Sequence, residues 1–92
     1  MLNLIELIQK LKIDYNLNKK IHFDVWICKT DIHGEINKNA PAFCGHFYWD
    51  KTTNDPTDIW NFINLPVKKY DFEALQNPTE YHLYVILQSN DF

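Results

Sequence analysis

The sequence predicts an α+β fold, a two-layer sandwich in which a small, mainly antiparallel sheet of three or more strands carries helices on one face. Two observations predict it. Residues 21–30 and 42–50 alternate apolar side chains with polar or aromatic ones, which is the period of two expected of strands with one buried face. Residues 3–13 instead place apolar side chains at helical spacing. The expected order of elements is helix, strand, strand, helix, short helix, strand.

The size and composition of the chain favour one folded unit. It has 92 residues, of which 46% are hydrophobic and 15% aromatic. A chain of this length can bury one modest core, so we expect a single domain over residues 1–92. The apolar content is too high for a disordered chain.

The first expected element is a helix over residues 3–13. Leu4, Ile8 and Leu11 share one face of it. Asn3 is suited to cap its first turn, and Glu6 three residues later completes a capping box. A helix this short is marginal alone, so we expect it to dock on the buried face of the sheet.

The two alternating strands each have one apolar and one chemically mixed face. In residues 21–30 the apolar face holds Phe23, Val25 and Ile27, and the mixed face holds His22, Asp24, Trp26 and Cys28. In residues 42–50 the apolar face holds Phe43, Phe47 and Trp49, and the mixed face holds Cys44, His46, Tyr48 and Asp50. We expect the apolar faces to form the core, so function should be sought on the mixed faces.

A hairpin is expected to join these strands, with its tip at residues 33–35. Gly34 can supply the positive φ of a tight turn. If Ile32 pairs with Ile36, the register follows, and it gives the pairings Asp24 with Cys44 and His22 with His46. Pro41 cannot donate to the ladder, and a bulge there would shift the register by one residue.

The second half of the chain predicts two further helices and a strand. Asp55 and Pro56 resemble an N-cap followed by proline at the first helical position, so a helix is expected over residues 56–65, before Pro66. A second cap at Asp71 predicts one turn of helix over residues 72–75. Residues 80–88 are almost continuously apolar, which is expected of a strand with neighbours on both sides.

Charge and cysteine content narrow the function classes. The net charge is −3, and the chain has no arginine, the main bidentate reader of guanine and phosphate. With no basic stripe visible either, we expect no nucleic-acid partner. No apolar run is long enough to cross a bilayer, and no signal peptide is recognisable. We therefore expect a cytoplasmic protein with no membrane partner, whose Cys28 and Cys44 are reduced.

The residues of the mixed strand faces also allow a site for chemistry, which we weigh as the alternative. His22, Asp24, Cys44 and His46 could form a metal or ligand site or serve a small enzyme. The closely spaced Cys and His pairs of common zinc sites are absent, and nothing in the sequence locates an oxyanion hole. No Gly-rich phosphate loop is present. We therefore expect no enzyme, no metal and no cofactor.

The first hypothesis is a small stand-alone module that binds another protein through an acidic and aromatic surface. Immunity proteins, antitoxins and phage-encoded inhibitors of bacterial defences are of this size and acidity, so an inhibitor of that type, from a phage or other mobile element, is expected. The candidate partner-binding residues are Trp26, Tyr48, Asp50, Asp55, Asp58 and Trp60. An exposed strand edge at residues 42–50 could also pair two copies, which would give a homodimer.

Overall fold

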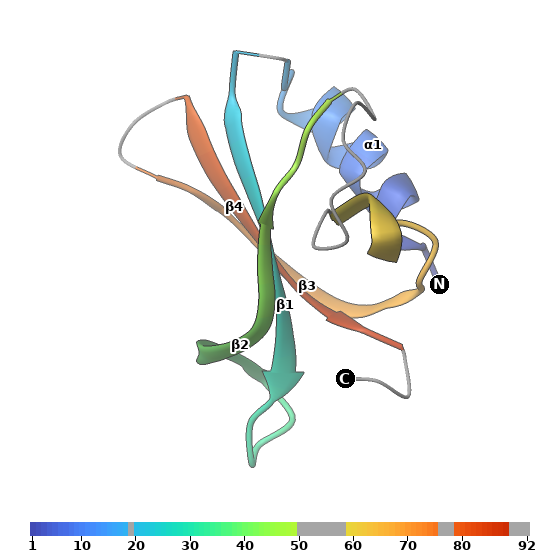
Figure 1. Cartoon of the computed structure of the whole chain (residues 1–92), viewed down its shortest axis with the longest axis vertical. Coiled ribbons are helices and arrows are strands. Elements are labelled where there is room, and N and C mark those ends of the chain that lie inside the picture. The colour runs from blue at the N-terminus through green and yellow to red at the C-terminus, as the bar shows by residue number, and fades with distance from the viewer. Residues whose placement is uncertain (19, 50–58, 76–78, 89–92) are drawn as a thin grey trace.

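The frame of the molecule is a four-stranded sheet in the order β2-β1-β4-β3 (Figure 1). The computed structural model describes residues 1–18, 20–49, 59–75 and 79–88. The strands are β1 (His22–Thr30), β2 (Ile36–His46), β3 (Val67–Ala74) and β4 (Glu80–Leu87). β1 is antiparallel to β2 but parallel to β4, and β3 is antiparallel to β4, so the sheet is mixed. The α+β class is thus confirmed, and the strands predicted at 21–30 and 80–88 correspond to β1 and β4. The bounds predicted for the strand at 42–50 are wrong, because β2 begins at Ile36 and ends at His46.

Helix α1 (Leu4–Asp14) forms where the sequence predicts it. The Asn3 side chain accepts a hydrogen bond from the Glu6 amide, and the Glu6 carboxylate accepts one from the Asn3 amide. This capping box satisfies two of the amides that a helix start leaves without partners. Leu4, Leu7, Ile8 and Leu11 are buried, so α1 presents one apolar stripe to the protein.

The segment before β3 satisfies further amides at the start of α1. The Leu4 amide donates to the Leu65 carbonyl, and the Ile5 amide donates to the Ile63 carbonyl. The Val67 amide in turn donates to the Leu2 carbonyl. These bonds tie the N-terminal end of α1 to the chain entering β3, and so fix the helix against the sheet.

One face of the sheet, here called the inner face, forms the core together with α1. Phe23, Val25 and Ile27 of β1 and Leu83 and Val85 of β4 are fully buried in it. They belong to the same apolar cluster as the buried stripe of α1. The predicted docking of the helix on the apolar face of the sheet is therefore confirmed.

The helix predicted at residues 72–75 is wrong, because these residues belong to or directly follow β3. Phe72 lies opposite Leu83 of β4, and its ring packs on those of Phe23 and Tyr81. A single turn of helix is marginal by itself. The ladder to β4 and the burial of Phe72 therefore outweigh the local preference that Asp71 suggested.

The helix predicted at residues 56–65 is present only as a short 3₁₀ helix, η1 (Ile59–Phe62), within the described residues. Ile59 and Ile63 are buried in the core. The chain leaves the helical path after Phe62 because the carbonyls of Ile63 and Leu65 bond to amides of α1 instead. The start predicted at Asp55 and Pro56 lies outside the described residues.

The opposite side of the sheet is here called the outer face. Both described helices, α1 and η1, pack into the core on the inner side, so neither covers this face. The first half of β2 bends across one end of the outer face. Lys38 of β2 there reaches Asp71 and Glu73 of β3, although β1 and β4 lie between β2 and β3 in the sheet. At the other end, near the start of β1, none of the described helices and strands crosses the face, and the His22 side chain is 52% exposed.

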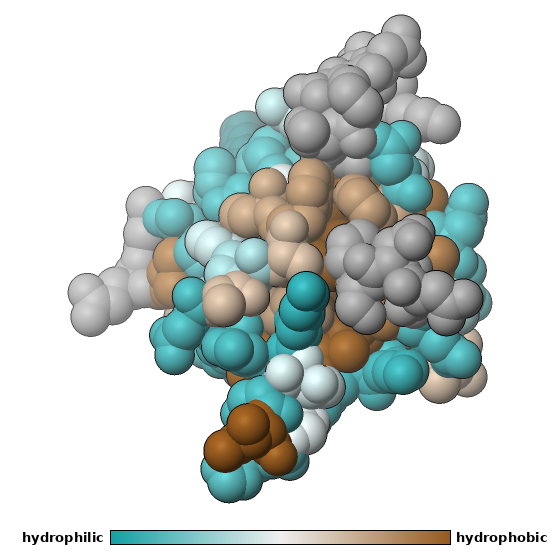
Figure 2. All heavy atoms as spheres, turned by 60° about the horizontal axis from the view of Figure 1, so that its bottom comes forward, coloured by the Kyte–Doolittle hydropathy of each residue, from teal (hydrophilic) through white to brown (hydrophobic). Residues whose placement is uncertain are grey.

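The hairpin between β1 and β2 projects from the sheet at the bottom of Figure 1. Gly34 has φ of +77°, as predicted, and the Asp31 side chain accepts from the amides of His33 and Glu35. Ile32, which was expected to pair with Ile36, is instead 95% exposed in the turn. Figure 2 shows a hydrophobic group at the protruding lower end of the molecule, bordered by hydrophilic residues.

Candidate functional site

The register of β1 and β2 determines which side chains meet on the outer face. Pro41 lies opposite Cys28, and the register shifts on both sides of this pair, as expected where a proline interrupts the ladder. The pairings that follow are Asp24 with His46 and Trp26 with Cys44. The predicted pairings of Asp24 with Cys44 and of His22 with His46 are therefore wrong. The irregularities shift β2 by more than the single residue that one bulge would produce.

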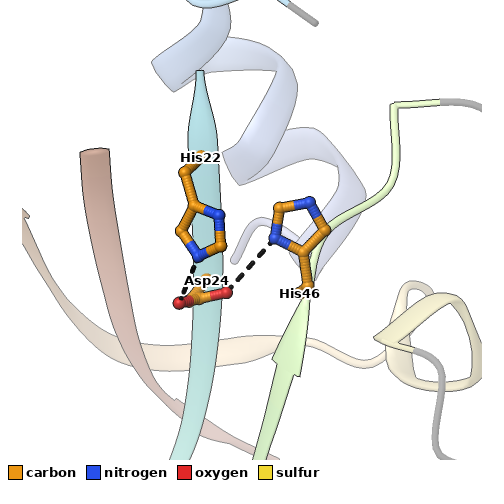
Figure 3. A group of neighbouring side chains, drawn as sticks. All are labelled: His22, Asp24 and His46. Atoms are coloured by element: carbon orange, nitrogen blue, oxygen red, sulfur yellow. Dashed lines mark hydrogen bonds and ion pairs between the residues drawn. The ribbon is translucent and has the colours of Figure 1, made fainter. Parts of the chain in front are cut away.

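Asp24 is the centre of a cluster of imidazoles at the open end of the outer face. His22 Nε2 lies 2.9 Å from Asp24 Oδ2, and His46 Nδ1 lies 3.3 Å from Asp24 Oδ1. Figure 3 shows the three side chains in front of β1 and β2, with α1 behind the strands. One carboxylate thus accepts hydrogen bonds from two imidazoles, one on each of its oxygens.

β4 adds a third imidazole beside the same carboxylate. His82 is the partner of Asp24 in the parallel ladder, and its Nε2 lies 3.7 Å from Asp24 Oδ2. The same nitrogen is 3.8 Å from Glu80 Oε1. Asp24, His46 and His82 therefore form one row across three strands, and His22 stands two residues along β1.

Aromatic rings support this cluster and border it. Trp26 stacks on Tyr84 with ring centroids 5.8 Å apart, and it also packs against His82. On the other side, the Tyr48 ring meets the edge of the His46 ring. Tyr48 is 49% exposed, whereas Trp26 is partly buried. Trp26 thus forms part of the floor of the outer face, and Tyr48 is the ring that solvent can reach.

The Trp26 indole lacks a hydrogen bond among the described residues. Its Nε1 is buried and finds no acceptor there. Leaving such a donor unsatisfied costs about 1–3 kcal/mol. The ring is therefore held by its stacking contacts rather than by a polar anchor.

At the end of the outer face that the first half of β2 covers, Lys38 contacts side chains of β3 and β4. The Lys38 ammonium donates to the carboxylates of Asp71 and Glu73 and lies 4.6 Å from the centroid of the Tyr84 ring. The two carboxylates raise the pKa of Lys38 above its ordinary value. Burial raises the pKa of the Tyr84 hydroxyl, and the nearby Glu73 carboxylate adds to the effect. This end therefore carries a fixed positive charge between two negative ones.

The two cysteines have different surroundings, and both are free thiols. Cys28 is buried and Cys44 is exposed. Burial raises the pKa of the Cys28 thiol, while Lys38 lowers it to a smaller extent. Desolvation by neighbouring side chains raises the pKa of Cys44, and the charges of Asp24 and Cys28 add to this. Both side chains are therefore poorer nucleophiles than an unperturbed cysteine.

Three of the six predicted partner-binding residues belong to the part of the chain that the structure describes, and these three lie on two sides of the sheet. Trp26 and Tyr48 lie on the outer side of the sheet. Trp60 belongs to the inner side, where it stacks on Phe47 and donates its indole N–H to the Tyr48 carbonyl. The other three candidates, Asp50, Asp55 and Asp58, lie outside the described residues.

Sequence reasoning missed the outer-face residues of β4, as it missed Lys38 of β2 and Asp71 and Glu73 of β3. Glu80, His82 and Tyr84 share that face, while Tyr81, Leu83 and Val85 point to the core. The alternation is visible in the sequence, but the almost continuous apolar character of residues 80–88 obscures it. Polar side chains at every second position indicate one shared face for Glu80, His82 and Tyr84, but they do not indicate which strand lies beside β4.

Comparisons with known proteins add no relative to this description. No protein-family model, no curated protein and no solved structure matches the chain. Within the described residues, no helix has the length and hydrophobicity that crossing a bilayer requires.

Proposed function

We propose that the chain is a protein-binding module whose recognition surface is the open end of the outer face. This surface consists of His22, Asp24, His46, Tyr48 and His82, and we call it the histidine face. The observation that carries the proposal is the exposed Tyr48 ring beside the Asp24 cluster, on a side of the sheet that neither described helix covers. Tyrosine buries much area at a low entropic cost, which makes it a frequent interface anchor.

The charge of the outer face favours a basic partner. Four of its carboxylates interact with its imidazoles or with Lys38, and they belong to Asp24, Asp71, Glu73 and Glu80. The Lys38 ammonium lies among them and contacts two of these carboxylates, those of Asp71 and Glu73. The net charge of the whole chain is also negative, at −3. Complementary charge guides diffusional encounter and fixes orientation, so we propose a partner with a cationic patch.

The face of the sheet is a better docking surface than its edges. The edge strand β2 contains Pro41 and its register shifts, and the edge strand β3 contains Lys68 and Lys69. Prolines, bulges and edge lysines are features that hinder the addition of another strand. A homodimer through paired edges is therefore the weaker alternative to a different protein bound on the histidine face.

Inhibition of the bound protein is the simplest activity for such a module, because it requires only binding. Neither cysteine is an activated thiolate, and the chain is small and acidic. A module of this kind can act by covering a functional site on a basic protein, as immunity proteins, antitoxins and phage anti-defence proteins do. We propose an inhibitor of this class because the size and net charge of the chain and the histidine face are compatible with it.

The test is quantitative capture with matched tyrosine variants. Tyr48→Ala removes the exposed ring of the histidine face, and Tyr70→Ala removes a ring of similar exposure, 44%, from β3. Tyr70 lies opposite Val85 and so belongs to the other side of the sheet. Tagged wild-type and variant proteins are incubated with extract of the source cells, and captured proteins are quantified by mass spectrometry.

The expected result is a basic protein captured by the wild type and by Tyr70→Ala, but at least fivefold less by Tyr48→Ala. Raising the salt concentration should also weaken capture, because opposite charges attract the two proteins. Equal loss in both variants, or equal retention in both, contradicts the proposed surface. Sedimentation velocity of the pure protein identifies the alternative, since self-association abolished by Tyr48→Ala would make a second copy the occupant.

A further inference from the structure

We propose that His22, Asp24 and His46 bind one divalent transition-metal ion of the zinc type. This inference goes beyond protein recognition and does not depend on it. One donor atom from each of these residues can be chosen so that all three lie within 4.8 Å of one another. They come from two adjacent strands whose ladder pairs Asp24 directly with His46.

The distances between the donors fit a common ion. Zinc binds imidazole nitrogen and carboxylate oxygen at about 2.0–2.2 Å, so two ligands of a tetrahedral site lie roughly 3.3 Å apart. His22 Nε2 is 2.9 Å from one carboxylate oxygen of Asp24, and His46 Nδ1 is 3.3 Å from the other. The two imidazole rings are 4.5 Å apart between centroids. The separations of up to 4.8 Å within the set exceed this spacing, so the side-chain torsions must turn the three donors toward one point when the ion binds.

The surroundings prepare the carboxylate for this role. Asp24 is 19% exposed and stands between imidazoles on both sides, since His82 Nε2 is 3.7 Å from its Oδ2. The other ring nitrogen of His82 lies 3.4 Å from the Tyr84 hydroxyl. His82 makes no hydrogen bond to the carboxylate at this distance, and we propose it as a positioning residue that borders Asp24. His22 is 52% exposed, so the ion would reach the site from solvent.

The donor set selects the class of ion. Two imidazoles and one carboxylate suit zinc and its neighbours, whereas calcium and magnesium take mainly oxygen ligands. The carboxylate supplies one negative charge, and three protein ligands leave a fourth position for water or a partner's side chain. Cys44 lies two pairings further along the ladder, opposite Trp26, and is not a ligand in this proposal.

The test is isothermal titration of the chelator-treated full chain with zinc chloride, with magnesium chloride as the ion control. We expect one zinc per chain with micromolar or tighter affinity and no heat from magnesium. His22→Ala and His46→Ala should each weaken zinc binding more than the about 10- to 100-fold typical of losing an outer partner. His82→Ala, which removes such an outer partner, should fall within that range.

Two variants serve as controls for adventitious binding. His33→Ala removes an exposed histidine of the hairpin turn, and Cys44→Ser removes the exposed thiol. Both should bind zinc like the wild type, and the cobalt-loaded protein should show no thiolate charge-transfer band. Circular dichroism confirms that each variant is folded.

The proposal is overturned if zinc does not bind, if it binds without fixed stoichiometry, or if His33→Ala weakens binding as much as His46→Ala. It is also overturned if Cys44→Ser abolishes binding, because the ion would then have a different ligand set. The titration uses the pure protein, so its result stands apart from partner capture. Capture repeated in the presence of chelator shows whether protein recognition survives without the ion.

Discussion

Asp24 of β1 lies directly opposite His46 of β2, and each oxygen of its carboxylate is within hydrogen-bond distance of a different imidazole. This relationship depends on the irregular ladder around Pro41. If the ladder continued without a shift from the Thr30–Ile36 pair beside the turn, His46 would instead lie opposite Lys20, and Cys44 opposite His22. The proline thus does more than end the regular pairing, because it determines which groups of the outer face meet.

The core should be sensitive to truncation in proportion to burial. Leu83 is fully buried between strands and α1, whereas Ile32 is 95% exposed. Leu83→Ala should lower the free energy of unfolding by about 2–5 kcal/mol, and Ile32→Ala should change it by less than about 0.5 kcal/mol. Urea denaturation followed by circular dichroism measures both. A large loss in Ile32→Ala would mean that the hairpin turn packs on something.

The cap of α1 makes a separate contribution to stability. Asn3→Ala removes the side-chain acceptor of the Glu6 amide and should cost about 1 kcal/mol. Gln9→Ala, at an exposed position in the same helix, is the matched control and should be neutral or slightly stabilising. Equal melting curves for wild type and Asn3→Ala would show that the capping box is not formed in solution.

The cysteines should differ in reactivity with iodoacetamide at neutral pH. Cys44 is exposed and should be alkylated, whereas Cys28, at 1% exposure, should react only after denaturation. The raised pKa of Cys44 leaves less thiolate than in a free cysteine, so alkylation should be slower and should accelerate as pH rises. Peptide mapping by mass spectrometry locates the label. Simultaneous labelling of both thiols would contradict the burial of Cys28.

The Lys38 contacts should stabilise the fold modestly. Lys38→Met keeps most of the apolar stem and removes the charge between Asp71 and Glu73. The side chain is 36% exposed, so solvent screens the pair and the loss should be no more than about 1 kcal/mol. Stability curves in urea for wild type and Lys38→Met give the difference.

The same contacts set a pH dependence with a definite sign. The pKa of Lys38 is raised in the folded protein, so its contribution is complete below the unfolded value of about 10.4 and is lost as pH rises through the higher folded value. The difference between wild type and Lys38→Met should therefore be constant from pH 7 to 9 and shrink only in strong alkali. A difference that grows with pH would contradict this assignment.

Local sequence patterns were sufficient to predict the elements that depend on residues close together in the chain. The capping box at Asn3, the turn at Gly34 and the two faces of β1 follow from spacing within a few residues, and the structure confirms each. The strand β3 was mistaken for a turn of helix because its stabilising contacts are with β4, which is distant from the local motif at Asp71. Short segments are decided by such tertiary contacts.

The candidate site was predictable only in part for the same reason. Alternation placed His22, Asp24 and His46 on one side of two strands, but it could not supply the register across Pro41 or the neighbour on the far side of β1. The parallel pairing with β4 brings His82 to Asp24, and nothing near either residue in the sequence specifies that pairing. Cys44, which the spacing grouped with His46, is two pairings away from Asp24.

The most direct test of the histidine face is imidazole NMR of the protein with its captured partner added. The four histidines give separate ring signals, and three of them, His22, His46 and His82, belong to the surface, while His33 lies in the hairpin turn. The account predicts that partner binding shifts or broadens the signals of these three. Unchanged signals from all three, with changes confined to α1 or to the hairpin, would show that the protein recognises its partner elsewhere.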